Sequence, residues 1–219
     1  MRLYSGKAPD FCEDAAHNRI ADKLKTAFLA TYRYEPGPAE VNSWRNSLRA
    51  MAQIIERANL GDSGVLLEFE LPLSSLRLDC MITGTDRAGA SNATIIELKQ
   101  WDRCDAAEGE CILTFTGGGN RDVLHPSVQV GSYCQYLADS HTAFHETSEA
   151  VNLSACAYLH NYAFAESDPL LDTKFDHWRS SYPVYSGELP LASCVERSCL
   201  SGPQLAALTC SHVIPISNL

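Results

Sequence analysis

Residues 65–99 read VLLEFELPLSSLRLDCMITGTDRAGASNATIIELK, and three runs within them have the pattern of β-strands. The runs at residues 65–71, 76–83 and 93–99 are rich in apolar residues, and clusters of Pro, Ser, Gly and Asn separate them, as is typical of strands joined by short loops. Because successive side chains of a strand point to opposite faces, one face is expected to be apolar and to pack on helices. This apolar face is expected to carry Leu67, Phe69, Leu71, Leu78, Cys80, Ile82, Ile96 and Leu98. The opposite, charged face is expected to carry Glu68, Glu70, Arg77, Asp79, Glu97 and Lys99.

Loop lengths predict which charged residues lie opposite each other. If residues 73–74 form a two-residue hairpin loop, Glu68 lies opposite Asp79. If the second and third strands pair symmetrically, Asp79 lies opposite Glu97. The three carboxylates then form a row across the sheet, each about 5 Å from the next, and Lys99 follows on the same face.

A row of like charges on neighbouring strands destabilises a sheet, unless a cation lies among them. Carboxylate oxygens are hard ligands that favour Mg²⁺ or Mn²⁺ over zinc. A lysine beside such an ion can orient a water molecule or help to deprotonate it. Together these groups are sufficient for the hydrolysis of a phosphodiester. The spacing alone leaves a second interpretation open, in which the charges form the solvated face of an antiparallel sheet.

The rest of the chain predicts helices around these strands. The apolar spacing predicts a helical pair before them and one helix after them, and a further buried strand follows. We expect two units, a domain over residues 1–190 and a C-terminal appendage of unknown role over residues 191–219. The predicted helices are residues 13–33, 39–58 and 126–138, the further strand is residues 155–162, and residues 105–120 form a mixed segment.

Composition limits the classes of protein that remain. The chain has 219 residues, of which 45% are hydrophobic and 20% charged, so it is long enough for a packed core and is not disordered or fibrous. No apolar run approaches the roughly 20 residues of a membrane span, and the N-terminus lacks a signal core. Nine cysteines without a CxxC pair disfavour a zinc ribbon or a disulfide framework. We therefore expect a cytoplasmic protein that does not contact membranes.

The net charge of −10 disfavours a broad basic surface for nucleic acid. The imbalance is uneven, because residues 1–121 hold 14 basic and 17 acidic side chains, whereas residues 122–219 hold 3 and 10. An anionic ligand is therefore expected to meet the first half of the chain, where a local patch or bound cations can attract it.

These residues resemble a known nuclease superfamily. Asp79, followed by Glu97-Leu98-Lys99 at the end of an apolar strand, looks like the core of the PD-(D/E)XK nucleases, and Gln129 with Tyr133 matches the Q-x-x-x-Y helix of the RecB-like members. Six stretches more specifically resemble the N-terminal domain of Schlafen-group-3-like DNA/RNA helicase proteins, and Ser43-Trp44 fits the same group. In chain order they are residues 68–72, 77–79, 96–101, 117–119, 125–129 and 157–162.

The resemblance implies a restriction-endonuclease-like α/β (α+β) fold, with a central mixed sheet flanked by helices, and a metal-dependent nuclease activity. Asp79, Glu97 and the Leu98 carbonyl are implied to bind Mg²⁺ or Mn²⁺, and Glu68 to hold a second ion or the attacking water. Lys99 is implied to position the water and to stabilise charge on the phosphate, and Gln129 to join the catalytic set. Contacts to substrate are expected from Tyr133, Arg77 and Gln100.

The chain departs from that helicase group in one respect. It contains no G-x-x-x-x-G-K-[ST] motif, and Gly117-Gly118-Gly119-Asn120 lacks the lysine of a phosphate loop. ATP-driven unwinding is therefore not expected of this chain. A separate ATPase or helicase partner and a homo-oligomer both remain open.

Other candidate residues have plainer explanations. His125 is expected to cap the helix that starts at Pro126, and His160 to be a core histidine. Arg77 is expected to form an ion pair, with Glu70 as the candidate partner, and Trp101 to pack at the strand end, with stacking as the alternative.

The sequence as a whole predicts a nuclease that hydrolyses DNA in a prokaryotic cytoplasm, in nucleic-acid processing or antiphage defence, with RNA as the other candidate substrate. The alternative is an inactive nuclease-fold module that binds nucleic acid or a protein partner.

Overall fold

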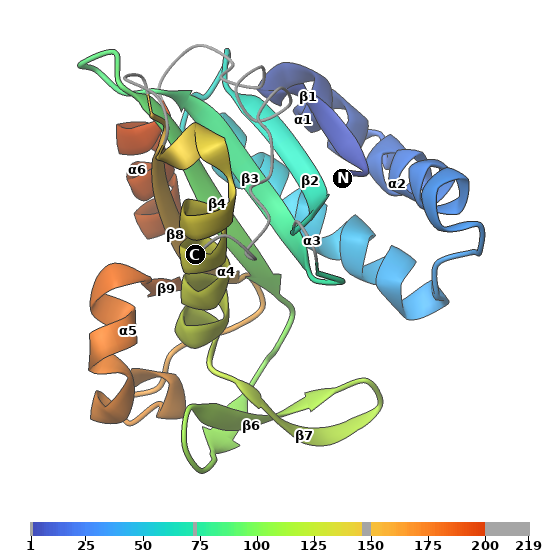
Figure 1. Ribbon diagram of the computed structural model, residues 1–219. Coiled ribbons are helices and arrows are strands. Elements are labelled where there is room, and N and C mark those ends of the chain that lie inside the picture. The colour runs from blue at the N-terminus through green and yellow to red at the C-terminus, as the bar shows by residue number, and fades with distance from the viewer. Residues whose placement is uncertain (1, 72–73, 146–149, 200–219) are drawn as a thin grey trace.

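A computed structural model describes residues 2–71, 74–145 and 150–199 of the chain (Figure 1). These residues form a six-stranded mixed sheet in the order β1-β2-β3-β4-β8-β9, and a separate three-stranded sheet in the order β5-β6-β7. In chain order the elements are β1 (Tyr4–Lys7), α1 (Ala8–Ala16), α2 (Arg19–Tyr32), α3 (Pro38–Arg57), β2 (Gly64–Glu70), β3 (Arg77–Thr85), β4 (Ser91–Lys99), β5 (Cys104–Ala106), β6 (Cys111–Thr116), β7 (Gly119–Leu124), α4 (Pro126–Ser140), η1 (Thr142–Phe144), β8 (Asn152–Leu159), η2 (Pro169–Leu171), η3 (Thr173–Phe175), α5 (Asp176–Ser181), β9 (Val184–Tyr185) and α6 (Glu188–Ser198).

The register predicted for the central strands is confirmed. Leu67 pairs with Cys80, and Cys80 pairs with Ile96, as the two loop lengths require. Part of the first predicted loop, at residues 72–73, lies outside the described residues. β1 to β4 are antiparallel, whereas β8 runs parallel to β4 and β9 parallel to β8. The mixed α/β class with a central sheet flanked by helices is therefore confirmed.

The prediction of one apolar and one charged face is wrong, because both faces of the sheet are covered. Leu67 and Cys80 pack toward α1, α2 and α3, whereas Phe69 and Leu78 pack toward α4. The alternation of β2 is interrupted at Glu68, whose φ of 51° lies in the left-handed region. The interruption lies in the row that contains the predicted acidic site.

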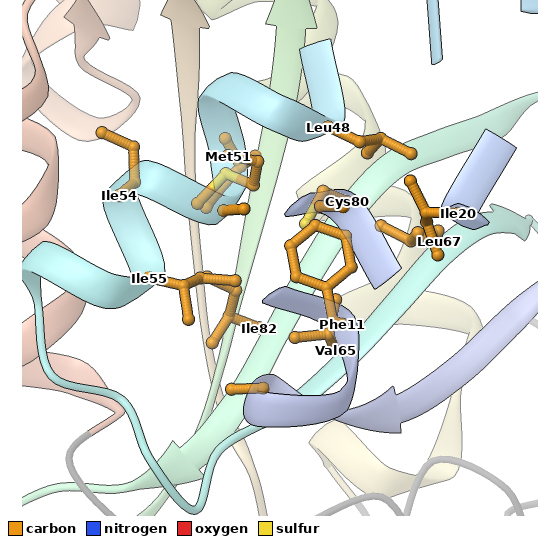
Figure 2. Close-up of a cluster of buried hydrophobic side chains, with 14 of the residues drawn as sticks. Phe11, Ile20, Leu48, Met51, Ile54, Ile55, Val65, Leu67, Cys80 and Ile82 are labelled. Carbon is orange, nitrogen blue, oxygen red and sulfur yellow. The ribbon is translucent and has the colours of Figure 1, made fainter. Parts of the chain in front are cut away.

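The first core lies between the sheet and the N-terminal helices (Figure 2). Phe11 of α1 and Met51 of α3 are fully buried against Val65 of β2. α3 begins with Pro38 at its first turn, where a missing N–H costs nothing, and its apolar stripe predicted from the sequence is buried. This helix therefore has a fixed position over β2 and β3.

A second core lies between the opposite face and α4. Val130, Tyr133 and Leu137 of α4 pack on this face of the sheet. Gly131 allows the end of α5 to approach, since a Cβ there would lie 3.0 Å from the Trp178 ring of α5 and 2.7 Å from the ring of Tyr182, the next residue after the helix. The helix is thereby held tightly against its neighbours.

The N-terminal helical pair is in fact three helices. The predicted helix over residues 13–33 begins earlier, at Ala8, and it is divided into α1 and α2 because Asn18 adopts a left-handed φ of 57°. The sequence analysis also missed β1, which pairs with β2 at the sheet edge. The mixed segment is the small sheet, whose β6–β7 hairpin projects from the end of the large sheet (Figure 1).

The C-terminal helix crosses the domain boundary that the sequence analysis places at residue 190. Leu191, Ala192 and Val195 of α6 belong to the first core. Residues 200–219 of the predicted appendage lie outside the described residues.

The structure also shows the state of the cysteines and the character of the helices in the described residues. Its eight cysteines, among them Cys80, Cys104 and Cys156, are all free thiols. No helix within the described ranges is both long and apolar enough to span a membrane.

Candidate active site

Asp79 is hydrogen-bonded to the end of the neighbouring strand. It lies on β3, where its carboxylate accepts a hydrogen bond of 2.7 Å from the main-chain N–H of Leu98 on β4. Burial raises the pKa of Asp79 well above its ordinary value, and the carboxylates of Glu97 and Glu68 raise it further. The three predicted carboxylates therefore interact electrostatically.

Glu97, Lys99 and two residues of α4 form one connected network. The Lys99 ammonium donates to Glu97 Oε1 at 2.8 Å and to Gln129 Oε1 at 2.9 Å. The Gln129 amide donates to the same Glu97 oxygen at 2.7 Å and to the Tyr133 hydroxyl at 2.8 Å. Both the oxygen and the nitrogen of the Gln129 side-chain amide are thus hydrogen-bonded, and these bonds connect α4 to the end of β4.

Lys99 is a cation within this network. Burial alone would lower the pKa of Lys99, but the carboxylates of Glu97 and Asp79 outweigh burial and raise it. Its ammonium also lies 5.3 Å from the centroid of the Trp101 ring, within cation–π range. The side chain is therefore held as a charged donor.

Glu68 faces α3 and is held by two partners. Its Oε1 accepts a 2.7 Å hydrogen bond from the Trp44 indole, and its Oε2 lies 3.2 Å from the Arg77 guanidinium. Burial raises the pKa of Glu68 to about 7, although Arg77 and Trp44 oppose the shift. Arg77 also pairs with Glu40 on α3. The predicted role of Glu68 in holding an ion or a water stays a prediction.

A pocket of about 350 Å³ opens over these groups. Glu68, Arg77, Asp79 and Leu98 line it from the sheet, and Ser43, Trp44 and Ser47 line it from α3. Two of the predicted acidic residues, Glu68 and Asp79, therefore line a cavity at the end of the central strands.

The donor set fits a hard divalent ion. Glu97 Oε2 is buried and has no hydrogen-bond partner among the described residues, and Asp79 adds a second carboxylate. Oxygen ligands of this kind suit Mg²⁺ or Mn²⁺. Within the described chain, no three His, Cys, Asp or Glu side chains gather closely enough to hold an ion together. Asp79, Glu97 and the Leu98 carbonyl contribute only two such side chains.

The remaining predicted substrate contacts have structural partners. The Gln100 amide donates to the Ser43 hydroxyl at 2.7 Å and to the Ser47 hydroxyl at 3.1 Å, so it connects the end of β4 with α3. Arg77 forms an ion pair as expected, with Glu40 and Glu68, and it lies across the ladder from Glu70. These contacts hold the walls of the pocket in place.

His125 has the predicted capping role, whereas His160 is not the core histidine that was predicted. His125 is fully buried and caps α4, where its Nδ1 accepts a 3.1 Å hydrogen bond from the Ser127 N–H. His160 is half-buried just after β8 and bonds to Ser47 at 3.1 Å, rather than lying inside a strand.

The sequence analysis identified no functional role for Trp44. Its indole N–H holds Glu68, and Glu40 and Ser47 of the same helix also line the pocket. Residues 40, 43, 44 and 47 share one helical face, and three of the four are polar. This pattern is a signal that could have identified the face of α3 at the site.

No protein-family model, curated protein or solved structure matches the chain.

Proposed function

We propose that the chain is a divalent-metal-dependent nuclease that hydrolyses phosphodiester bonds. The observation that supports it most strongly is the meeting of Asp79, Glu97 and Lys99 beside a pocket, where one Glu97 oxygen is buried without a donor. Burying like charges next to each other destabilises the folded protein, and a bound cation would offset this effect.

The proposed roles follow from the contacts. Asp79, Glu97 and the Leu98 carbonyl would hold a Mg²⁺ or Mn²⁺ ion, which would supply an activated water and neutralise charge on the phosphate. Lys99 donates to a phosphate oxygen as negative charge develops there. Gln129 keeps Lys99 and Glu97 in their relative positions through its two hydrogen bonds. The water oxygen forms a bond to phosphorus and releases a proton to solvent, while the bond to the leaving oxygen breaks and that oxygen takes up a proton from solvent.

We propose DNA as the substrate, with RNA as the competing polymer in the test. The proposed setting is a prokaryotic cytoplasm, where the chain would act in nucleic-acid processing or antiphage defence, alone or with a separate ATPase. The restriction-endonuclease-like relationship is part of this proposal.

The test is cleavage of end-labelled duplex DNA, single-stranded DNA and RNA with Mg²⁺ or Mn²⁺. We expect wild type to cut, and Asp79→Asn and Lys99→Met to lose cutting by about 10²-fold or more, as is usual when a group that stabilises transition-state charge is removed. Lys25→Met is the matched control, because Lys25 is an exposed lysine of α2 that pairs with Glu35. If all three variants cut as well as wild type, the catalytic residues lie elsewhere in the protein.

A second candidate is an inactive module that binds nucleic acid or a protein partner. It is favoured by the direct 2.8 Å pair between Lys99 and Glu97 and by the engagement of Glu68 with Trp44 and Arg77, because these contacts stabilise the charges without an ion. A wild-type protein that binds nucleic acid but cuts none of the three substrates would support this candidate.

A further inference from the structure

A second pocket lies next to the carboxylate site, between the end of β4 and the β6–β7 hairpin. Its volume is about 350 Å³. Lys99 and Gln129 line it on the side of the site, Trp101 follows them, and Phe115 and Thr116 line it from the hairpin. The pocket thus combines polar groups of the candidate site with aromatic residues outside it.

The two pockets border each other. Ser43 of α3 and Leu98 of β4 line both of them. A polymer whose phosphate lies at Asp79 and Lys99 would therefore extend into the second pocket. Phe115, Thr116 and Val123 of the β6–β7 hairpin, which projects from the end of the large sheet (Figure 1), line this pocket.

Phe115 is the unusual residue of this wall. It is 60% exposed near the tip of the hairpin, at a position where a polar residue would cost less. The turn that follows contains Gly117 and Gly118, both with positive φ, and exposed Arg121 lies on the returning strand. An exposed aromatic ring beside a phosphate site is suited to stacking on a base whose face is free.

The charge balance of the chain favours a contact of this type. With 17 basic and 27 acidic residues, the protein has little charge for broad phosphate contacts. The cations nearest the site are also neutralised, since Lys99 pairs with Glu97 and Arg77 with Glu40 and Glu68. Affinity for a nucleic acid must then depend on uncharged contacts to a greater degree than usual.

We propose that the second pocket binds an unpaired base, stacked on Phe115, and that the substrate is single-stranded or locally unpaired at this point. The inference rests on the proposed function, because it names the form of nucleic acid that the same site takes. In a duplex both faces of each base are stacked on neighbouring bases. The Phe115 ring can therefore stack on a base only where that base is unstacked from a neighbour.

The test measures binding of fluorescent oligonucleotides by anisotropy in EDTA, where cleavage does not interfere. The probes are single-stranded DNA, single-stranded RNA and a blunt DNA duplex. We expect Phe115→Ala to weaken binding of a single strand by about 5- to 100-fold, and Phe115→Tyr to restore it. Leu124→Ala is the matched control, since Leu124 is 44% exposed on the same hairpin and does not line the pocket.

The effect of Phe115→Ala is also expected to be the same at about 50 and 200 mM salt, because stacking, unlike phosphate contacts, releases no counterions. The duplex is expected to bind both proteins equally. The single strand, DNA or RNA, whose binding is weakened more by Phe115→Ala is the polymer that the pocket binds.

Three results would overturn the inference: no binding of either single strand by wild type, equal binding by wild type and Phe115→Ala, or an equal loss of duplex binding. Its failure is distinguishable from failure of the proposed function. If the protein cuts with metal but Phe115→Ala does not change binding, only the inference about Phe115 is refuted. If a single strand binds through Phe115 but is not cut, only the nuclease proposal is refuted.

Discussion

Replacing His125 with Asn should remove a pH dependence of stability from the protein. His125 is fully buried at the start of α4, stacks on Phe175 with ring centroids 4.0 Å apart, and accepts from Ser127 through Nδ1. Its Nε2 therefore carries the proton and donates to the Leu170 carbonyl at 3.1 Å. The imidazole is thus held neutral in the folded state.

The magnitude follows from the pKa shift. Burial lowers the pKa of His125 from 6.5 to about 4, and the nearby charges of Arg179 and Lys174 act in the same direction. Between these two values the unfolded chain binds more protons than the folded chain, so the free energy of unfolding falls as the pH falls. At about 1.4 kcal/mol per pKa unit, His125 accounts for a loss of about 3 kcal/mol between pH 6.5 and pH 4.

His125→Asn keeps a side-chain acceptor at the N-cap and does not titrate. The assay is urea unfolding of both proteins at several pH values across this window. The stability of wild type relative to the variant should fall by about 3 kcal/mol from neutral pH to about pH 4. Parallel pH profiles would refute the argument, because they would mean that His125 is not held neutral. The position matters for the site, since the main-chain N–H of Gln129 donates to the His125 carbonyl at 3.0 Å.

Three further substitutions test the packing around the site. Trp44→Phe removes the 2.7 Å donor to Glu68 and should reduce stability by about 1–3 kcal/mol in denaturant unfolding, whereas an unchanged midpoint would mean that the bond contributes nothing. Glu68→Gln removes a carboxylate whose pKa is raised to about 7, so the wild type should lose about 3 kcal/mol relative to the variant as the pH rises from 4.5 to 7 in thermal unfolding, and a constant difference would contradict the shift. Gly131→Ala places a Cβ 2.7 Å from the Tyr182 ring and should cost about 1–3 kcal/mol, and a neutral result would show that α5 can move away freely.

The register of the central sheet could be predicted because two short loops determine it. Once the lengths of these two loops are fixed, the pairing among β2, β3 and β4 follows, and Cys80 pairs with both Leu67 and Ile96. The same argument brings Asp79 to the end of β4, where its carboxylate accepts from the Leu98 N–H. Gln129 of α4 reaches Glu97, and Tyr133, one turn later on the same helix, accepts a hydrogen bond from Gln129.

Features that depend on single backbone conformations were not predictable. Glu68 adopts a left-handed φ inside a strand, and Asn18 does so inside a helical pattern; no local preference requires either. The first inverts the faces of β2, and the second divides one predicted helix into two. The partners of Arg77 also escaped prediction, because Glu40 and Glu68 come from elements that tertiary packing brings together.

The central claim is that Asp79 and Glu97 together hold a divalent ion, and a calorimetric titration with Mn²⁺ tests it most directly. Wild type should bind Mn²⁺, and Glu97→Gln, which removes the charge and one oxygen of a buried ligand, should weaken binding by about tenfold or more. Glu56→Gln, at an exposed position of α3, serves as the matched control and should bind like wild type. A wild type that binds no Mn²⁺, or a Glu97→Gln variant that binds it equally well, would contradict the claim.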